Sequence, residues 1–224
     1  MLRGWVAGSA VLAMFAGCAP ATTPVEAGPL PTDAAHFAPD GTSVVFLVRH
    51  GRTVFNDKNL VQGWSDAPLT PEGEAQASAA GVALKEVEFS AVLTSDLGRA
   101  RQTTEAILSE NIHAIGPREV AELREENYGG FEGDVDVDFW VTIMESMGYR
   151  FDTAKSADPG DFWSNPDAVA WYGAITDAER TDAIAKADPV GRAEDWAAYS
   201  GRMRDAVAQI SRTVGDHPGN ILVV

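Results

Sequence analysis

The stretch VFLVRHGRT, from Val45 to Thr53, ends an apolar run abruptly on an arginine and a histidine. The run before Arg49 is β-branched or apolar without alternation, which is typical of a strand buried on both faces. Arg49 and His50 are costly to bury unpaired, so they are expected just beyond the strand. Ligands of an open α/β sheet bind at the carboxyl ends of its strands, so these two side chains are predicted to line a pocket. Gly51 lets the chain turn there without an obstructing side chain.

Two further apolar runs, at residues 90–95 and 220–224, repeat this strand pattern, and helical patterns lie between the three runs. Thr70 is predicted to cap one helix and Ser95 a second. Apolar residues at spacings of three and four within residues 199–214 predict a third helix. Strands that alternate with helices predict an α/β fold, with a mostly parallel sheet and helices on both faces.

Residues 134–192 interrupt this alternation. They hold three of the six tryptophans and are broken by prolines, so we expect a helical insertion here. Trp140, Trp163 and Trp171 need apolar partners, which makes a disordered acidic loop the weaker interpretation.

Composition limits the classes of partner. The 224 residues suffice for one compact domain with a sizeable core, or for two small ones. The formal net charge of −16 argues against broad affinity for nucleic acid or an anionic membrane surface. Lysines and arginines number only 17, so arginines that share a motif are expected to serve a local anion. The four histidines show no ligand spacing, and we expect neither a metal nor another cofactor.

The first residues carry the pattern of an export signal. Arg3 precedes an apolar run too short to span a membrane, and the only cysteine, Cys18, follows a Phe-Ala-Gly sequence that resembles a bacterial lipobox. We therefore expect residues 1–17 to be a lipoprotein-type signal peptide, and the exported chain to be lipid-anchored through Cys18 at the bacterial cell membrane or in the periplasm. An ordinary signal peptide with a chance cysteine is the alternative. Residues 18–41 are predicted to be a flexible tether, and residues 42–224 the folded domain.

Four motifs resemble, in order and spacing, those of the histidine phosphatase superfamily, the phosphoglycerate mutase-like proteins with an RHG motif. They are LVRHGRTVFN, QGWSDAPLTPEGEAQA, LTSDLGRARQTTEAI and ELREENYGGFEG, and the resemblance extends from Val44 to Gly133. It implies a phosphoglycerate mutase-like fold. It also implies phosphoryl transfer through a phosphohistidine, on a small phosphorylated substrate.

The resemblance implies a role for each matching residue. His50 corresponds to the nucleophile, and Arg49 and Arg99 to catalytic arginines that also bind the phosphate. Asn56 corresponds to a further phosphate ligand, and Thr53 is a weaker candidate for a ligand through its hydroxyl. Such a cluster suits phosphoryl transfer, because the transferred group spreads negative charge over three oxygens.

A leaving alkoxide must also be protonated, so an acid is required. Glu125 matches the position of the family's proton donor, and neighbouring Glu126 is the alternative. Burial or nearby phosphate charge has to raise the pKa of the residue that acts as the acid.

The resemblance further implies a second histidine just after the last strand, where this sequence reaches Val224. His217 precedes that strand and is expected too far from the pocket to replace it, and His113 is expected to be structural. We therefore expect a truncated gene product or a natural pseudoenzyme, with phosphate binding retained and catalysis impaired.

These observations favour an exported phosphomonoesterase, a histidine-type phosphoric monoester hydrolase that acts through a phosphohistidine on His50. One alternative is a phosphoglycerate mutase-like phosphotransferase, which export disfavours because the phosphoglycerate pool is cytoplasmic. Another is a catalytically impaired phosphate-binding lipoprotein. The acid phosphatase and phytase branch is disfavoured, because RHGRTVF lacks the arginine and proline that follow its RHG motif.

Overall fold

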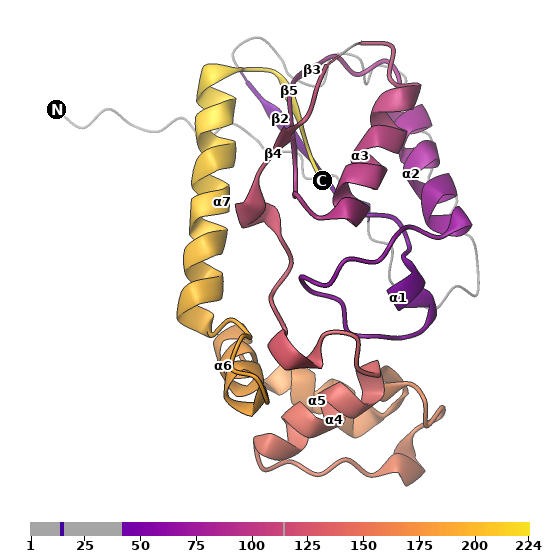
Figure 1. Ribbon diagram of the computed structural model, residues 1–224, viewed down its shortest axis with the longest axis vertical. Coiled ribbons are helices and arrows are strands. Elements are labelled where there is room, and N and C mark those ends of the chain that lie inside the picture. The colour runs from indigo at the N-terminus through magenta and orange to yellow at the C-terminus, as the bar shows by residue number, and fades with distance from the viewer. Residues whose placement is uncertain (1–13, 16–41, 114) are drawn as a thin grey trace, which may run out of the picture. The chain divides into compact units, whose positions relative to one another are not determined.

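The computed structural model describes residues 14–15, 42–113 and 115–224 (Figure 1). Of the expected signal peptide and tether it describes Met14 and Phe15 alone, as a two-residue strand. Cys18 and the rest of that region lie outside the described residues.

The chain divides into two compact units, each with its own hydrophobic core. Of the described residues, the first unit comprises those up to Arg52, those of Leu69–Leu123 and those of Val207–Val224, and the second comprises Thr53–Pro68 and Arg124–Ala206. Residues 134–192, the expected insertion, fall within the second unit.

The first unit is built around a five-stranded sheet in the order β1-β2-β5-β3-β4, and all neighbouring strands are parallel (Figure 1). The strands are β1 (Met14–Phe15), β2 (Val44–Val48), β3 (Phe89–Thr94), β4 (Arg118–Glu119) and β5 (Asn220–Val223). Val223 of β5 pairs with Leu47 on one side and with Leu93 on the other. The carboxyl ends of β2, β5 and β3 therefore lie at one edge of the sheet.

Helices cover both faces of this sheet. They are α2 (Pro71–Ala83), α3 (Gly98–Glu110) and, from Val207 onward, α7 (Trp196–Asp216); a 3₁₀ turn, η2, spans Ala121–Leu123. On one face, Phe46 and Leu222 share a cluster with Ile107 of α3. On the other face, Ile210 of α7 packs against the cluster that holds Ile221. The predicted α/β fold with a parallel sheet between helices is confirmed.

The caps of α2 and α3 differ in how well the sequence predicts them. Thr70 caps α2 as predicted, since its hydroxyl accepts a hydrogen bond from the Gly73 N–H at 3.1 Å. The prediction for Ser95 was wrong, because Leu97 occupies the cap of α3. Ser95 instead accepts a hydrogen bond from Leu97 N–H at 3.4 Å, so its hydroxyl is used in the turn before the helix. Arg99 still lies in the first turn of α3.

The second unit is helical. Its elements are α1 (Val54–Asp57), η3 (Gly129–Phe131), α4 (Asp136–Ser146), η4 (Thr153–Lys155), η5 (Phe162–Ser164), α5 (Pro166–Ala174), α6 (Asp177–Ala187) and the first half of α7. Phe139, Ile143, Phe162 and Ile184 form the centre of its core and are almost completely buried. Residues 134–192 are therefore helical, as predicted.

The three tryptophans of the insertion pack together. Trp140 and Trp171 are 8% and 3% exposed and belong to the core of the second unit. Trp163 is 42% exposed, but its ring meets Trp140 edge-on with centroids 5.7 Å apart. These contacts supply the apolar partners that the composition of the insertion requires.

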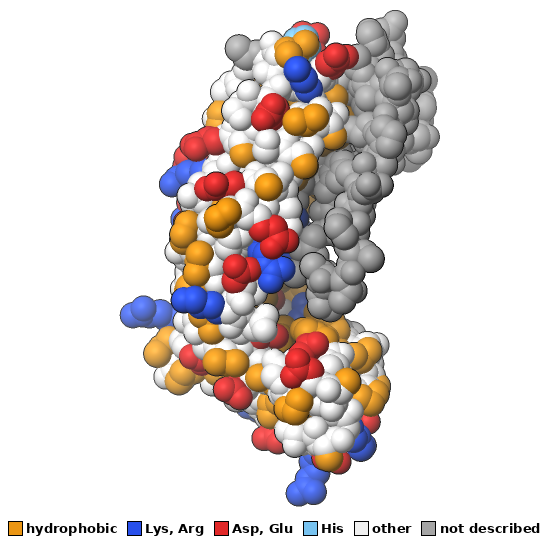
Figure 2. All heavy atoms as spheres, turned by 90° about the vertical axis from the view of Figure 1, so that its right-hand side faces the viewer, with side chains coloured by type: hydrophobic (Ala, Val, Ile, Leu, Met, Phe, Trp, Pro, Cys, Tyr) orange, Lys and Arg blue, Asp and Glu red, His pale blue; other side chains and the backbone are white. Residues whose placement is uncertain are grey.

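Among the described helices, none combines the length and the apolar character needed to cross a bilayer. Figure 2 shows acidic and basic side chains interspersed over the coloured part of the face that it draws.

Candidate active site

The turn that follows β2 orients the His50 imidazole. Nδ1 of His50 lies 2.9 Å from the carbonyl oxygen of Gly51. A carbonyl oxygen only accepts hydrogen bonds, so Nδ1 donates, and when the ring is neutral its lone pair lies on Nε2. An imidazole in this tautomer is ready to attack an electrophile through Nε2.

This turn is pressed against the first turn of α2. A Cβ atom at Gly51 would lie 2.3 Å from the carbonyl oxygen of Gly73, and a Cβ atom at Gly73 would lie 2.0 Å from that of Arg52. The Thr70 N–H also donates to the Arg52 carbonyl at 2.8 Å. The two backbones can approach this closely because neither glycine carries a side chain.

Thr103 joins the same turn to α3. Its hydroxyl oxygen accepts a hydrogen bond from the Gly51 N–H at 3.0 Å and donates one to the Arg99 carbonyl at 2.8 Å. Thr103 is fully buried, and Arg99 is only 2% exposed. The first unit thus links the main chain beside His50 to the main chain of Arg99 through one side chain, at the edge where Arg49 also lies.

In the second unit, Thr53 and Asn56 form a capping box at the start of α1. The Asn56 N–H donates to the Thr53 hydroxyl at 3.2 Å, and the Thr53 N–H donates to Oδ1 of Asn56 at 3.1 Å. Oδ1 of Asn56 is therefore engaged in the cap, while its Nδ2 is the atom suited to an anion. The Thr53 hydroxyl donates its proton to Oε1 of Gln62 at 2.7 Å, and its role toward a phosphate stays a prediction.

Gln62 is a site candidate that the sequence motifs alone do not single out. Its Nε2 is buried and has no hydrogen-bond partner among the described residues. An unsatisfied buried donor costs about 1–3 kcal/mol, which an anionic oxygen would recover. Its place in the QGW motif was a possible signal, but the contact with Thr53 that orients its amide is visible only in the folded chain.

The paired glutamates of the fourth motif have opposite environments. Glu125 is exposed, and its Oε1 accepts a hydrogen bond from the Glu126 N–H at 2.9 Å. Glu126 is 3% exposed. Burial raises the pKa of Glu126 to about 7, although the charge of Arg180 and the hydroxyl of Thr181 oppose the shift. The burial expected of the acid therefore falls on Glu126.

Glu132 ties the second motif to the fourth within the second unit. Its carboxylate accepts hydrogen bonds from the main-chain N–H groups of Gly63, Trp64, Ser65 and Tyr128, at 2.7–3.1 Å. Four donors on one carboxylate hold the loop of the second motif firmly against the segment that carries Glu125.

The predicted site residues thus fall into two sets. His50, Arg49 and Arg99 belong to the first unit, and Thr53, Asn56 and Glu125 to the second. The described residues contain no group of three histidine, cysteine, aspartate or glutamate side chains placed to hold a metal ion.

His217 lies at the other edge of the sheet from His50. It precedes Asn220, which pairs with Val44 at the start of β2, whereas His50 follows the end of β2. The expectation that His217 does not reach the predicted pocket agrees with this register.

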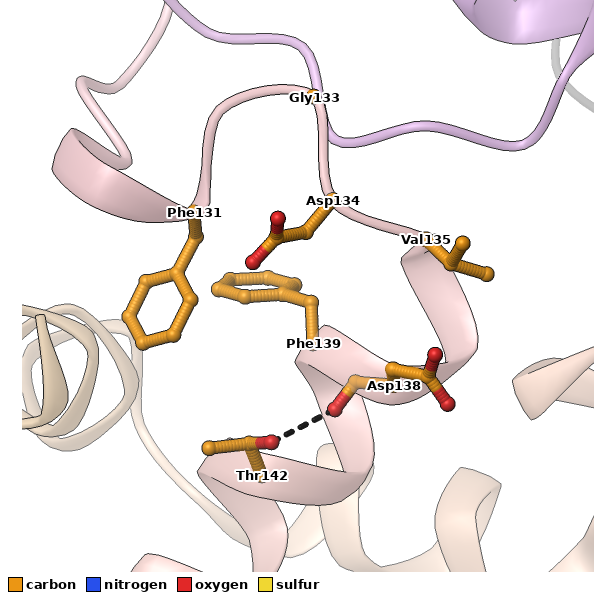
Figure 3. Close-up of a pocket in the computed structure, with 7 residues that line it drawn as sticks. All are labelled: Phe131, Gly133, Asp134, Val135, Asp138, Phe139 and Thr142. Carbon is orange, nitrogen blue, oxygen red and sulfur yellow. Dashed lines mark hydrogen bonds between the residues drawn. The ribbon is translucent and has the colours of Figure 1, made fainter. Parts of the chain in front are cut away.

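A pocket of about 420 Å³ lies in the second unit at the start of α4, lined by Phe131, Gly133, Asp134, Val135, Asp138, Phe139 and Thr142. Figure 3 shows the rings of Phe131 and Phe139 beside each other and the carboxylate of Asp134 above the Phe139 ring. None of the predicted site residues lines this pocket. Its two carboxylates would repel a phosphorylated ligand, so it does not suit a phosphate site.

Comparison with protein families places these motifs in context. Residues 45–170, more than half of the chain, match the family described as the histidine phosphatase superfamily (branch 1). The matched range contains all four motifs.

Individual relatives agree with this match. The 2,3-bisphosphoglycerate-dependent phosphoglycerate mutase of Cytophaga hutchinsonii is 42% identical over 90 residues, which are 40% of this chain and 42% of that protein. Fructose-2,6-bisphosphatase TIGAR B of Danio rerio is 42% identical over 95 residues, which are 41% of this chain and 37% of that protein. The chain thus spans about two-fifths of the length of these curated relatives.

A solved structure extends the likeness over more of the chain. The crystal structure of a phosphoglycerate mutase from Bacillus anthracis str. Sterne superposes with a TM-score of 0.66 at 30% identity, over 80% of this chain and 73% of that one.

Proposed function

The chain belongs to the histidine phosphatase superfamily (branch 1), and from this premise we propose that it is a phosphomonoesterase that forms a phosphohistidine at His50. The observation that carries the proposal is the 2.9 Å contact of His50 Nδ1 with the Gly51 carbonyl, which leaves the lone pair on Nε2. A small phosphorylated molecule is the proposed substrate.

In the proposed first step, Nε2 of His50 attacks phosphorus and the bond from phosphorus to the leaving oxygen breaks. Glu125 gives its proton to that oxygen. Arg49, Arg99 and Asn56 hold the remaining phosphate oxygens, because charge-assisted hydrogen bonds to an anion are the strong ones.

In the second step, water attacks the phosphohistidine and the phosphorus–nitrogen bond breaks. The Glu125 carboxylate takes a proton from that water, inorganic phosphate leaves, and His50 returns to its neutral form. Gln62 joins the phosphate ligands in this proposal, because its buried Nε2 needs an acceptor.

Labelling tests the nucleophile. The protein is mixed with a ³²P-labelled aryl phosphate and quenched in alkali, and the acid-labile label is counted. We expect label on the wild type and on His217→Ala, since His217 lies at the other edge of the sheet, and none on His50→Ala. Label that persists in His50→Ala would overturn the proposal.

Two substitutions decide which glutamate is the acid. An alkyl leaving group needs a proton, whereas a good aryl leaving group departs without one, so loss of the acid slows alkyl esters selectively. We expect Glu125→Gln to slow transfer from an alkyl phosphate by about 10²-fold or more, with a much smaller effect on an aryl phosphate. The same selectivity in Glu126→Gln, and not in Glu125→Gln, would assign the role to Glu126.

A phosphoglycerate mutase-like phosphotransferase is the second candidate, supported by the similarity to the Cytophaga hutchinsonii mutase. It would pass the label from His50 to an acceptor hydroxyl rather than to water. A catalytically impaired phosphate-binding lipoprotein is the third candidate, supported by the position of His217 away from the edge that carries His50. It would bind phosphate and take up no label.

We further propose export and lipidation at Cys18, supported by the pattern of residues 1–17. Mass spectrometry of the membrane fraction tests this proposal. A diacylglyceryl group on an N-terminal Cys18 is expected, and an unmodified N-terminus downstream of Cys18 would refute it.

A further inference from the structure

Arg202, on α7, is hydrogen-bonded to the main chain at Glu125 and at the residue before it. Its Nη1 donates to the carbonyl oxygen of Arg124 at 2.6 Å, and its Nη2 donates to that of Glu125 at 3.0 Å. The other edge of the same guanidinium, Nε and Nη2, forms a bidentate ion pair with Glu194. Both side chains of this pair are almost buried, at 13% and 12% exposure, so solvent screens the pair little.

Glu194 holds the next residue of the same segment. Its Oε2 accepts a hydrogen bond from the Asn127 N–H at 3.0 Å, and its own N–H donates to the Asn127 carbonyl at 3.0 Å. The ion pair of Glu194 with Arg202 thus grips the segment from Arg124 to Asn127 at both ends.

Trp64 adds a third fastening. Its indole N–H donates to the Glu125 carbonyl at 2.9 Å, so this oxygen accepts hydrogen bonds from both Trp64 and Arg202. The guanidinium carbons of Arg124 and Arg202 lie 4.6 and 5.8 Å from the centre of the Trp64 ring. The backbone of Trp64 is in turn bonded to Glu132.

We propose that Arg202, Glu194 and Trp64 form a clamp that positions Glu125 for proton transfer. This inference rests on the proposed function of Glu125. The three residues act through the main chain of Glu125, so they are positioning residues and not catalytic ones. A solvent-exposed acid on an irregular segment needs such support, because a displacement of about 1 Å from productive geometry can cost about 10²-fold in rate.

The clamp has a signature that a purely structural role lacks. Displacing the acid slows departure of an alkoxide and spares departure of a phenolate, whereas loss of folded protein slows both equally. The ratio of phosphoryl transfer to His50 from an alkyl and from an aryl phosphate is therefore the quantity to measure.

The variants are Arg202→Gln and Trp64→Phe. The first removes the guanidinium that bonds the Arg124 and Glu125 carbonyls, and the second keeps an aromatic ring but removes the indole N–H. We expect each to lower the alkyl-to-aryl ratio, by about tenfold for Arg202→Gln and less for Trp64→Phe. Arg204→Gln on the same helix and Trp163→Phe in the same unit are the matched controls, with an unchanged ratio.

Hydrogen exchange gives a second readout that needs no turnover. Amides of residues 124–127 should exchange faster in Arg202→Gln and Glu194→Ala than in Arg204→Gln, because the clamp holds that segment. An unchanged rate there would overturn the clamp, and Trp64→Phe keeps the test decisive if Arg202→Gln does not fold.

Glu125→Gln, measured in the same assay, distinguishes failure of the clamp from failure of the proposed role of Glu125. If it lowers the ratio and neither clamp variant does, the clamp is wrong and the role of Glu125 stands. If Glu125→Gln leaves the ratio unchanged, or the wild type takes label from neither ester, the proposed function fails and the clamp fails with it.

Discussion

The carboxyl group of Glu126 is buried inside the second unit, and this environment explains its raised pKa. Glu126 is 3% exposed, and its Oε1 is buried without a hydrogen-bond partner among the described residues. Burial is the main cause of its raised pKa, and the charges of Glu125 and Glu194 add to it, against the attraction of Arg180. The folded state therefore binds this proton more tightly than the unfolded state does.

Glu126→Gln is expected to change how stability depends on pH. The pKa of Glu126 rises from 4.5 to about 7 on folding, so the wild type loses free energy of unfolding as pH rises through this window. The loss amounts to about 3 kcal/mol at most. The glutamine variant lacks this titration. In urea unfolding, its free energy of unfolding should therefore rise relative to that of the wild type between pH 4.5 and pH 8. Parallel curves for the two proteins would contradict the prediction.

At this scale the sequence predicts positions better than environments. Arg49 and His50 lie beyond the end of β2 because a buried strand cannot hold them unpaired. The burial of Glu126 depends on α6, more than fifty residues away along the chain, and the orientation of Gln62 depends on Thr53. Such contacts between distant segments cannot be predicted from a local sequence pattern.

The start of α2 is the element that shapes the turn of His50. Pro71 and the Thr70 cap place the first turn of the helix where its backbone meets that turn. Gly73 is required there because the nearest atoms belong to the main chain of Arg52 and cannot move aside as a flexible side chain would.

Gly73→Ala is expected to lower the free energy of unfolding by about 1–3 kcal/mol, since the added methyl group overlaps the Arg52 carbonyl. It should also reduce phosphohistidine formation, because the turn of His50 has to shift. Gly173→Ala in α5 is the matched control. No atom lies within 4 Å of its added methyl group, so it should be neutral or stabilising. Urea unfolding and labelling of both variants provide the measurement, and equal stability would contradict the prediction.

Helices and strands were predictable where a local pattern decides them. Strands β2, β3 and β5 follow from continuous apolar runs, and α2 follows from Thr70, whereas β1 and β4 were not predicted. The apolar face predicted for α7 is interrupted at Val207, which is 61% exposed, while Ile210 of the same helix packs on the sheet. Spacing identifies a helix, but it does not say which of its apolar residues find a partner.

The whole molecule carries a large negative charge, so an anion can bind only where nearby positive side chains attract it. A net charge of −16 disfavours small anions in general, so any anion that stabilises the fold has to be held by a specific cluster. Arg49 and Arg99 are the proposed members of that cluster in the first unit.

Vanadate, an analogue of the transferred phosphoryl group, is expected to raise the melting temperature of the full chain. At 100 times its Kd, a ligand adds about 2.7 kcal/mol, which corresponds to a rise of several degrees for a protein of this size. Arg99→Gln should lose this rise, whereas Arg204→Gln, a change on the surface of α7, should keep it. Equal stabilisation of both variants in a thermal shift assay would place the anion elsewhere.

The family is predictable from the four motifs, because their order and spacing survive in the sequence. The division into two compact units is not, since it follows from contacts between segments as distant as Thr53–Pro68 and Arg124–Ala206. Composition allowed one domain or two small ones, and no linker in the sequence marks the boundary.

The bond that orients His50 ends on a main-chain oxygen, and every amino acid carries one. Point mutation of a neighbouring side chain therefore cannot delete this acceptor, unlike the buried aspartate that orients the histidine of a serine protease. A substitution can break this contact only by changing the path of the backbone. The backbone has little freedom here, because there is no room for a Cβ atom at Gly51. Substitutions among the neighbouring side chains should thus leave the proposed nucleophile in the same orientation, whatever they do to the proposed phosphate ligands.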